Sequence, residues 1–312
     1  MKALFFTLLC LIWGSTWLAI KIGLADCPPF TFAAIRFILA TLVMCGILKY
    51  RHLSISRRWR DLRGALCFGV FNGISYALVF WGEQYISSGL TSIINATLPF
   101  FSAVFAYFLV GERFTLAKGT GLAIGFGGVL LVFSRELGEL GGANLYGQMA
   151  ILLAAASYAL GGTLAKRYQN RLGLLQEVTV QMGVTALVIT PLLFLERGRS
   201  FVPDAGFVLA LLYLVLVGSV AAFLLYFWLL ERMEISRLSH SSLITPVIAT
   251  LLGAWWAHEE VFWQYVAGLA VILLGVWIVN RPRAGGEPVK RTEVPERGIA
   301  AAKQPNTFIK GR

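Results

Sequence analysis

The sequence predicts an all-α membrane protein with ten transmembrane helices, arranged as two inverted five-helix repeats. Three observations lead to this prediction: an apolar composition, ten apolar windows of membrane-spanning length, and a self-similarity at a fixed offset of 147 residues. Of the 312 residues, 57% are hydrophobic and only 14% are charged. A soluble domain carries about 25% charged residues, so this composition excludes a soluble enzyme, a disordered protein and a coiled coil.

Each expected helix is an apolar window of about 20 residues, the length that crosses a bilayer core. Short connections containing charge, Gly or Pro separate the windows, so neighbouring helices should be antiparallel. The first window follows Met1-Lys2 as a signal peptide would, but its length and the late Lys21 favour a retained helix. The ten windows are 3–25, 30–48, 64–84, 90–110, 115–134, 147–166, 174–195, 206–230, 238–257 and 261–280.

The basic residues predict the orientation of the chain. With the N-terminus inside, 22 of the 27 Lys and Arg residues fall in cytoplasmic segments and 3 in outer connections, with Lys21 and Arg36 left within helices. Cytoplasmic loops carry the excess of Lys and Arg, so both termini should be cytoplasmic in a plasma (inner) membrane. A basic tail, 281–312, is expected to be disordered. Anionic lipid headgroups account for the net charge of +11 without nucleic acid.

Two segments of the chain, 1–134 and 147–280, align with each other as repeats. Each contains five windows, an odd number, so the two repeats enter the membrane from opposite sides. Inverted repeats of this kind are the architecture of alternating-access transporters. Near the start of each half the offset is 145 instead of 147. The aligned pairs include Lys21 with Lys166, Phe80-Trp81 with Phe227-Trp228, Pro99 with Pro246, and Glu112 with Glu259.

A family resemblance supports the same architecture. The first half carries Leu11-Ile12-Trp13-Gly14-Ser15-Thr16-Trp17, then Lys21, Pro28-Pro29, Arg36-Phe37 and the run from Pro99 to Gly111-Glu112-Arg113. These motifs resemble the EamA family of the drug/metabolite transporter superfamily, over residues 5–280. The second half is more degenerate, with Tyr158-Ala159 in place of Trp13-Gly14. The resemblance implies a ten-helix inner-membrane carrier, typically an exporter of amino acids, related metabolites or toxic compounds.

Pro99 and Pro246 stand near the middles of the windows 90–110 and 238–257. A proline there leaves the carbonyl four residues back without its donor, and in lipid such a carbonyl must face protein or a wet cavity. The prolines therefore predict hinges beside a polar substrate cavity. Packing kinks, with hydroxyls that join helices, are the alternative. The predicted cavity residues are Trp13, Ser15, Thr16, Asn95, Tyr158, Ser239, His240 and Ser242.

Some members of this set could act on the substrate directly. His240 could relay protons, because histidine titrates near working pH, or donate to a substrate carboxylate; an interhelical hydrogen bond is the alternative. Trp13 and Tyr158 could form aromatic walls, for which the alternative is an interfacial aromatic belt. Trp81 and Trp228 lie near window ends and fit the belt better.

Several charged residues lie near the ends of windows or inside them. Burying a charge at such a depth costs free energy unless the charge is paired or hydrated. We therefore predict an outer gate of Lys21 and Arg36 with Glu83, and an inner gate pair of Lys166 with Glu231. Glu83 is the acidic candidate for proton coupling. Snorkelling lysines and an interfacial glutamate are the alternative.

The sequence thus predicts a secondary transporter that exports small metabolites, such as amino acids, related compounds or drugs, by alternating access. An importer or exchanger of similar solutes is the alternative. A membrane-embedded enzyme fits less well, because nucleotide-binding, hydrolase and metal motifs are missing. We expect no cofactor, no metal and no nucleic acid; the partners are a small-molecule substrate and the lipid bilayer. The most apolar windows, 115–134 and 261–280, could support a homodimer.

Overall fold

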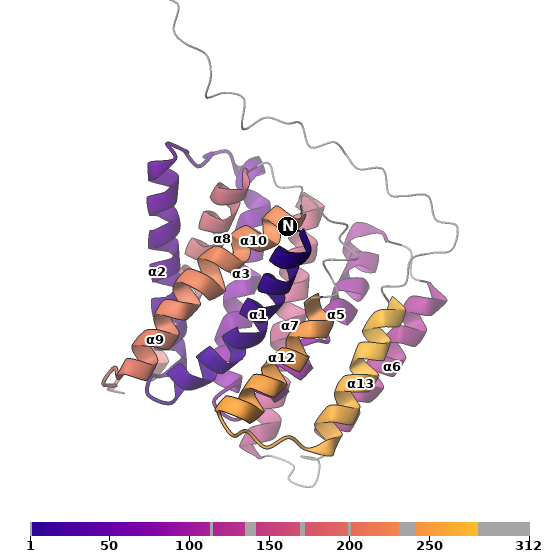
Figure 1. Ribbon diagram of the computed structural model, residues 1–312. Coiled ribbons are helices and arrows are strands. Elements are labelled where there is room, and N and C mark those ends of the chain that lie inside the picture. Colours follow the sequence, from indigo (N-terminus) through magenta and orange to yellow (C-terminus); the bar gives the residue numbers. More distant parts are fainter. Residues whose placement is uncertain are drawn as a thin grey trace, which may run out of the picture. The chain divides into compact units, whose positions relative to one another are not determined.

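The computed structural model describes residues 2–112, 115–134, 142–168, 172–198, 201–230 and 241–279. Within these ranges all regular secondary structure is helical (Figure 1). Eight helical stretches are long and apolar enough to cross a membrane, and each overlaps one of the first eight predicted windows. Two shorter apolar helices overlap the last two windows. The predicted tail, 281–312, lies outside the described residues.

Most of the described spans are α-helical throughout, but three of them contain a 3₁₀ or π-helical segment. The α-helices are α1 (Lys2–Leu24), α2 (Pro29–Tyr50), α3 (Trp59–Gly82), α4 (Ser88–Asn95), α5 (Leu98–Phe105), α6 (Leu116–Phe133), α7 (Ala143–Tyr168), α8 (Leu174–Ile189), α9 (Ala205–Tyr213), α10 (Ala222–Leu230), α12 (Ser241–Trp256) and α13 (Trp263–Val279). A 3₁₀ segment, Thr190–Glu196, extends α8, and π-helical segments follow α5 (Ala106–Val110) and join α9 to α10 (Leu214–Ala221).

Local signals in the sequence set several helix starts. Pro29 occupies the first turn of α2, where a missing amide hydrogen costs nothing. Asp204 caps α9 by accepting a hydrogen bond from the Phe207 amide at 2.6 Å. Glu196 accepts from the Phe30 and Thr31 amides at 2.9 and 2.8 Å, and so caps α2 from the end of the α8 span. Capping of this kind matters in lipid, where water cannot serve the free amides.

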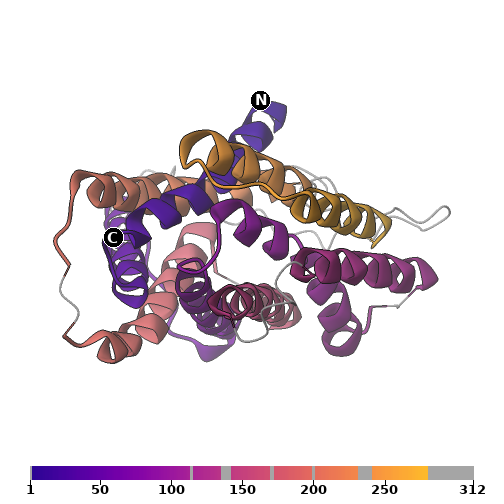
Figure 2. The ribbon, with the colours of Figure 1, turned by 90° about the horizontal axis from the view of Figure 1, so that it is seen from below.

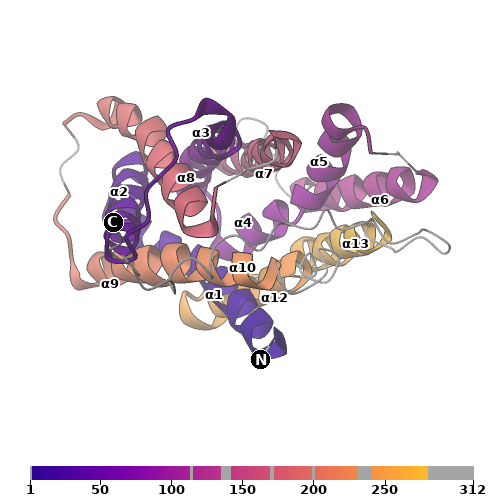
Figure 3. The same ribbon diagram turned by 90° about the horizontal axis from the view of Figure 1, so that it is seen from above.

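The helices run roughly side by side, with α1 passing through the bundle and α2 lying far from α6 and α13 (Figures 1 and 3). The view from below shows α6 and α13 as neighbours on one side (Figure 2). Their backbones meet at glycines: a Cβ on Gly121 would lie 2.8 Å from the Gly275 oxygen, and one on Gly128 would lie 2.8 Å from the Gly268 oxygen. Small residues allow this close approach.

Candidate functional site

A cavity of about 580 Å³ lies among helices from both halves of the chain. One end, which we call the closed end, is lined by buried side chains, among them Ile20, Arg36 and Val79. At the other end, which we call the open end, it reaches Glu112 and Lys166, whose side chains are 37% and 61% exposed. The volume lies within the range of small-molecule pockets, about 300–1,000 Å³.

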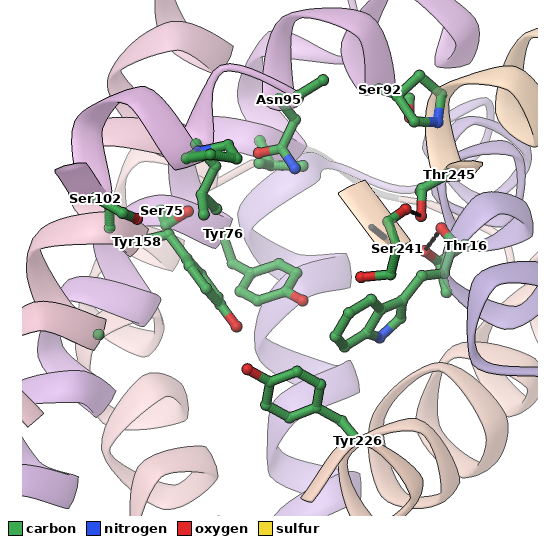
Figure 4. A pocket seen from close by; sticks show the side chains of 18 of the residues that line it. Thr16, Ser75, Tyr76, Ser92, Asn95, Ser102, Tyr158, Tyr226, Ser241 and Thr245 are labelled. Atoms are coloured by element: carbon green, nitrogen blue, oxygen red, sulfur yellow. Dashed lines mark hydrogen bonds between the residues drawn. The ribbon is translucent and has the colours of Figure 1, made fainter. Parts of the chain in front are cut away.

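Aromatic side chains form much of the cavity wall. Trp13 lines it and packs against Tyr226, with ring centroids 5.3 Å apart. The hydroxyl groups of Tyr76, Tyr158 and Tyr226 are directed toward one another inside the cavity (Figure 4). Trp228, by contrast, does not line it and packs edge-on against Phe5. These walls offer flat apolar surfaces together with hydroxyl groups.

The predicted polar residues divide into three groups. Thr16 and Asn95 line the cavity, together with Ser92, whose hydroxyl has no hydrogen-bond partner among the described residues. Ser15 does not line it; its hydroxyl is hydrogen-bonded to the Tyr213 hydroxyl at 2.6 Å. Three predictions cannot be followed: Ser239 and His240 lie outside the described residues, and only the backbone of Ser242 lies inside them.

Tyr76 and Tyr226 were missed by the sequence analysis, although the repeat contained a signal for them. At the offset of 147, Tyr76 aligns with Phe223 and Val79 aligns with Tyr226. All four side chains line the cavity. Tyr76 and Val79 are three residues apart on α3, as are Phe223 and Tyr226 on α10, so the two residues of each helix lie on one face. A search for bulky residues at matching helical spacing in both repeats would have found them.

The span that contains Pro99 is broken, whereas the helix that contains Pro246 is not. α4 ends at Asn95 and α5 begins at Leu98, with Pro99 in its first turn. Pro246 lies inside the continuous helix α12. Asn95 and both prolines line the cavity. The two predicted hinges therefore differ: only the first coincides with an interruption of the described backbone.

We expect Pro99→Ala to lower the transport rate about fivefold more than Pro246→Ala. Restoring a continuous helix at Asn95–Leu98 would favour one conformation by about 1 kcal/mol, which corresponds to that factor. Initial rates of solute uptake by proteoliposomes, normalised to folded protein, measure the difference. Equal rates in the two variants would mean that the break at Pro99 does not serve as a hinge.

The closed end is held by two side chains: Lys21 binds the backbone of the α3–α4 connection, and Glu259 binds the N-terminus of α4. From α1, Lys21 Nζ donates to the carbonyl oxygens of Glu83 and Ile86, each at 2.8 Å. From the α12–α13 connection, the Glu259 carboxylate accepts from the Ser88 amide at 2.8 Å, the Ser88 hydroxyl at 2.9 Å and the Gly89 amide at 3.2 Å. An ammonium on carbonyls and a carboxylate on a helix N-terminus are both favourable pairings.

Two further charged groups of the predicted outer gate are deeply buried. Arg36 is 1% exposed, and its Nε donates to the Ser219 hydroxyl at 3.2 Å. Glu83 is 0% exposed, and neither of its carboxylate oxygens has a hydrogen-bond partner among the described residues. Lys21 contacts the main chain of Glu83, not its carboxylate. The predicted side-chain pairing of Lys21 with Glu83 is therefore replaced by a bond to the backbone.

At the open end, Glu112 joins two lysines. Its carboxylate lies 3.0 Å from Lys166 Nζ and 3.2 Å from Lys118 Nζ. Partial burial tends to raise the pKa of the Glu112 carboxyl, but the hydrogen bonds and charges of Lys166 and Lys118 lower it below its ordinary value. The partner of Lys166 is thus Glu112, while its predicted partner, Glu231, lies outside the described residues.

The model of the EamA-like transporter family matches this chain over residues 1–134 and 145–281. Among curated proteins, an uncharacterized transporter of Bacillus subtilis, YoaV, is 26% identical over 275 residues, covering 86% of this chain and 92% of its own. An uncharacterized inner membrane transporter of Escherichia coli, YedA, is 27% identical, covering 87% of this chain and 88% of its own.

An uncharacterized transporter of Archaeoglobus fulgidus is 28% identical over 273 residues, covering 87% of this chain and 95% of its own. Among solved structures, one protein crystal structure is similar with a TM-score of 0.62 at 20% identity, covering 89% of this chain and 95% of that one. At this identity the structural likeness concerns the fold alone.

Proposed function

This chain belongs to the EamA-like transporter family, and from that premise we propose that it is a secondary transporter that exports small metabolites by alternating access. It is a multi-pass membrane protein, and its curated relatives are named as transporters. Amino acids and related compounds, or drugs, are the proposed substrates. Export follows from the resemblance of the first-half motifs to this family, and an importer or exchanger of similar solutes is the second candidate.

The proposed architecture is ten spanning helices in two inverted repeats, 1–134 and 147–280. Contacts between α6 and α13 support it. Gly121 aligns with Gly268 and Gly128 with Gly275 in the repeat. In space Gly121 faces Gly275, which is the repeat counterpart of Gly128. Gly128 in turn faces Gly268, which is the repeat counterpart of Gly121. Two antiparallel helices related by a two-fold axis would make this exchange of partners.

One observation carries the proposal of alternating access: aligned residues of the two repeats are in different states. At the closed end, Lys21 binds the connection between α3 and α4, and Glu259 binds the N-terminus of α4. Their counterparts, Lys166 and Glu112, instead bind each other at the open end. We propose that Lys21 and Glu259 form a closed-end latch. Lys166 and Glu112 would form the equivalent latch of the opposite conformation, here released.

The open end is proposed to face the cytoplasm. The loops there would include Lys118, Lys166 and Arg167, which belong to the lysine- and arginine-rich side of the predicted topology. The conformation would then be inward-open, with both termini cytoplasmic in the inner membrane. Lys21, Arg36 and Glu83 would lie at the outer gate, and Lys166 and Glu231 at the inner one.

Glu83 is the proposed coupling site for protons. Its buried carboxylate lies behind the closed-end latch, with the cations Lys21 and Arg36 and the carboxylate Glu259 as its charged neighbours. Opening of the latch would expose it to water and change these neighbours.

The other proposed partners are the lipid bilayer and a second copy of the chain. Either would cover the exposed apolar side chains of α6 and α13, such as Leu130 and Leu274. The proposal involves no cofactor, metal or nucleic acid.

Radiolabelled-solute counterflow in proteoliposomes tests this function. Amino acids, nucleosides and cationic drugs are screened, with and without a pH gradient. We expect at least one class to accumulate transiently against its unlabelled counterpart, and we expect Glu83→Gln to remove the effect of the pH gradient while exchange persists. The control is that protein extracted from the vesicles still elutes as a single peak in gel filtration. If no solute class exchanges in such a sample, a transporter of these solutes is contradicted.

The lowered pKa of the Glu112 carboxyl gives a pH prediction for the open end. A group whose pKa is lowered on folding stabilises the protein above its ordinary pKa, and this stabilisation is lost as the pH falls through the lowered value. Glu112→Gln should therefore lower the melting temperature by about 1–2 °C at pH 7.5 and not at acid pH, as expected for a partly exposed pair. Glu260→Gln, at an exposed carboxylate, is the control. A difference that grows toward acid pH would contradict the pairing.

A further inference from the structure

Arg36 places a full positive charge at the closed end of the cavity. It lines the cavity, is 1% exposed, and stands on α2 well inside a membrane-spanning helix. A charge at this depth costs several kcal/mol unless a partner or water stabilises it, and so points to a functional site. No carboxylate among the described residues lies within 4.0 Å of its guanidinium, which leaves the charge without a salt bridge; the buried Glu83 carboxylate is a charged neighbour beyond that distance.

The contacts of Arg36 satisfy it only in part. Nε donates to Ser219, and the guanidinium carbon lies 5.1 Å from the centroid of the Tyr76 ring and 5.2 Å from that of Phe37. Nη1 is buried and has no hydrogen-bond partner in the part of the chain that is described. Cation–π contacts and the neighbouring Tyr76 hydroxyl partly compensate the buried guanidinium, but they supply no acceptor for Nη1.

Arg36 lines the cavity and Glu83 does not, so among the described residues the closed end presents an unpartnered cationic donor to an anion. A guanidinium binds a carboxylate with two parallel hydrogen bonds, which are stronger than neutral ones. The remaining charged residues of the described lining, Glu112, Lys118 and Lys166, lie at the open end and sum to a positive charge. A cavity with low-dielectric walls focuses such a field and raises the local concentration of anions.

The aromatic walls indicate the rest of the ligand. Trp13, Tyr76, Tyr158 and Tyr226 present flat faces and hydroxyl groups between the closed end and the open end. We propose that the cavity binds a planar or aromatic substrate that carries a carboxylate, with the carboxylate on Arg36 and the ring among these side chains. This inference rests on the proposed transport function and assigns its substrate class.

The charge of the cavity can be measured without knowing the substrate. Thr16 and Arg36 both adjoin Gly218: a Cβ there would lie 2.8 Å from Thr16 Cγ2 and 3.7 Å from Arg36 Nη2. A single cysteine is placed by Thr16→Cys after Cys10, Cys27, Cys45 and Cys67 are replaced by alanine. Its rate of modification is compared for a negatively charged sulfonate-bearing methanethiosulfonate and a positively charged trimethylammonium-bearing one. Each rate is normalised to that of a free thiol.

We expect the anionic reagent to react at least about tenfold faster, since a unit charge at this separation acts strongly in a partly desolvated site. Arg36→Lys should keep this preference and Arg36→Gln should abolish it. Ser102→Cys, farther along the lining toward the open end, is the matched control and should respond less to Arg36→Gln. Equal rates, or faster reaction of the cation, would overturn the proposal even if Arg36→Gln failed to fold.

Paired ligands then test the carboxylate directly on the same single-cysteine chain with Arg36 retained. We expect 3-phenylpropanoate and indole-3-acetate to slow modification of Thr16→Cys at least about tenfold more than their primary amides do. Protection by the amides equal to that by the acids would overturn the anion site. Since neither measurement requires transport, a cavity that selects anions in a protein that shows no counterflow would leave this inference standing and refute the proposed function instead.

Discussion

Replacing Glu259 by alanine is expected to lower counterflow at least about tenfold. The substitution removes three hydrogen bonds to a carboxylate, from the Ser88 amide, the Ser88 hydroxyl and the Gly89 amide. Each hydrogen bond to a charged group contributes about 1.5–3 kcal/mol, and a buried amide left without an acceptor adds a further cost. The closed end would then open more readily. The conformation in which the cavity is open only at the open end would therefore be less populated, and alternation between the two conformations would be slower.

Two matched variants make this prediction specific. Glu260→Gln, at the exposed neighbouring residue, should transport normally. Glu259→Gln keeps an acceptor oxygen but loses the charge, so its rate should fall between those of the wild type and Glu259→Ala. Gly253 is required for the same contact, because a Cβ there would overlap the Glu259 carboxylate. Normal transport by Glu259→Ala would mean that this carboxylate caps a helix and does not latch the closed end.

Replacing Lys21 by methionine should impair transport as strongly as the loss of Glu259. The methionine keeps the length of the side chain but leaves the carbonyls of Glu83 and Ile86 without their donor. The double exchange Lys21→Glu with Glu83→Lys should not restore transport. A carboxylate at 21 would face backbone oxygens and be repelled by them. Initial counterflow rates of the two single variants and the double variant measure this.

Recovery of transport in the double exchange would contradict the backbone latch and restore a direct ion pair between residues 21 and 83. Loss of folded protein in the variants is detected by gel filtration in detergent. If the double variant does not fold, Lys21→Arg is compared with Lys21→Met instead. It keeps a charged donor and should retain more transport than Lys21→Met.

The helices could be predicted from the sequence because lipid requires long, uninterrupted apolar runs. The windows 30–48 and 90–110, for example, correspond to the spans Pro29–Tyr50 and Ser88–Val110. The interruption between Asn95 and Leu98 was less accessible. Pro99 and Pro246 occupy equivalent places in the sequence, and only the local backbone distinguishes the broken helix from the continuous one.

The site was predicted less completely, because charges were matched only with other charges. Lys21 binds carbonyl oxygens and Glu259 binds amides, and backbone groups carry no signature in a sequence. Glu112 was noted as the repeat counterpart of Glu259 and as part of a family motif, and its contact with Lys166 depends on how the π-helical segment Ala106–Val110 approaches the end of α7. Thr16, Asn95 and Tyr158 could be found because polar and aromatic residues are rare inside apolar windows.

The central claim is that the two ends of the cavity open in alternation, and paired spin-label distances test it most directly. One pair of labels, at Tyr85 and Glu260, spans the closed end; the other, at Leu116 and Arg167, spans the open end, and all four sites are exposed. Distances are measured by double electron–electron resonance with and without saturating substrate. The account predicts that one pair lengthens as the other shortens. Two distances that stay fixed, or that lengthen together, would contradict it.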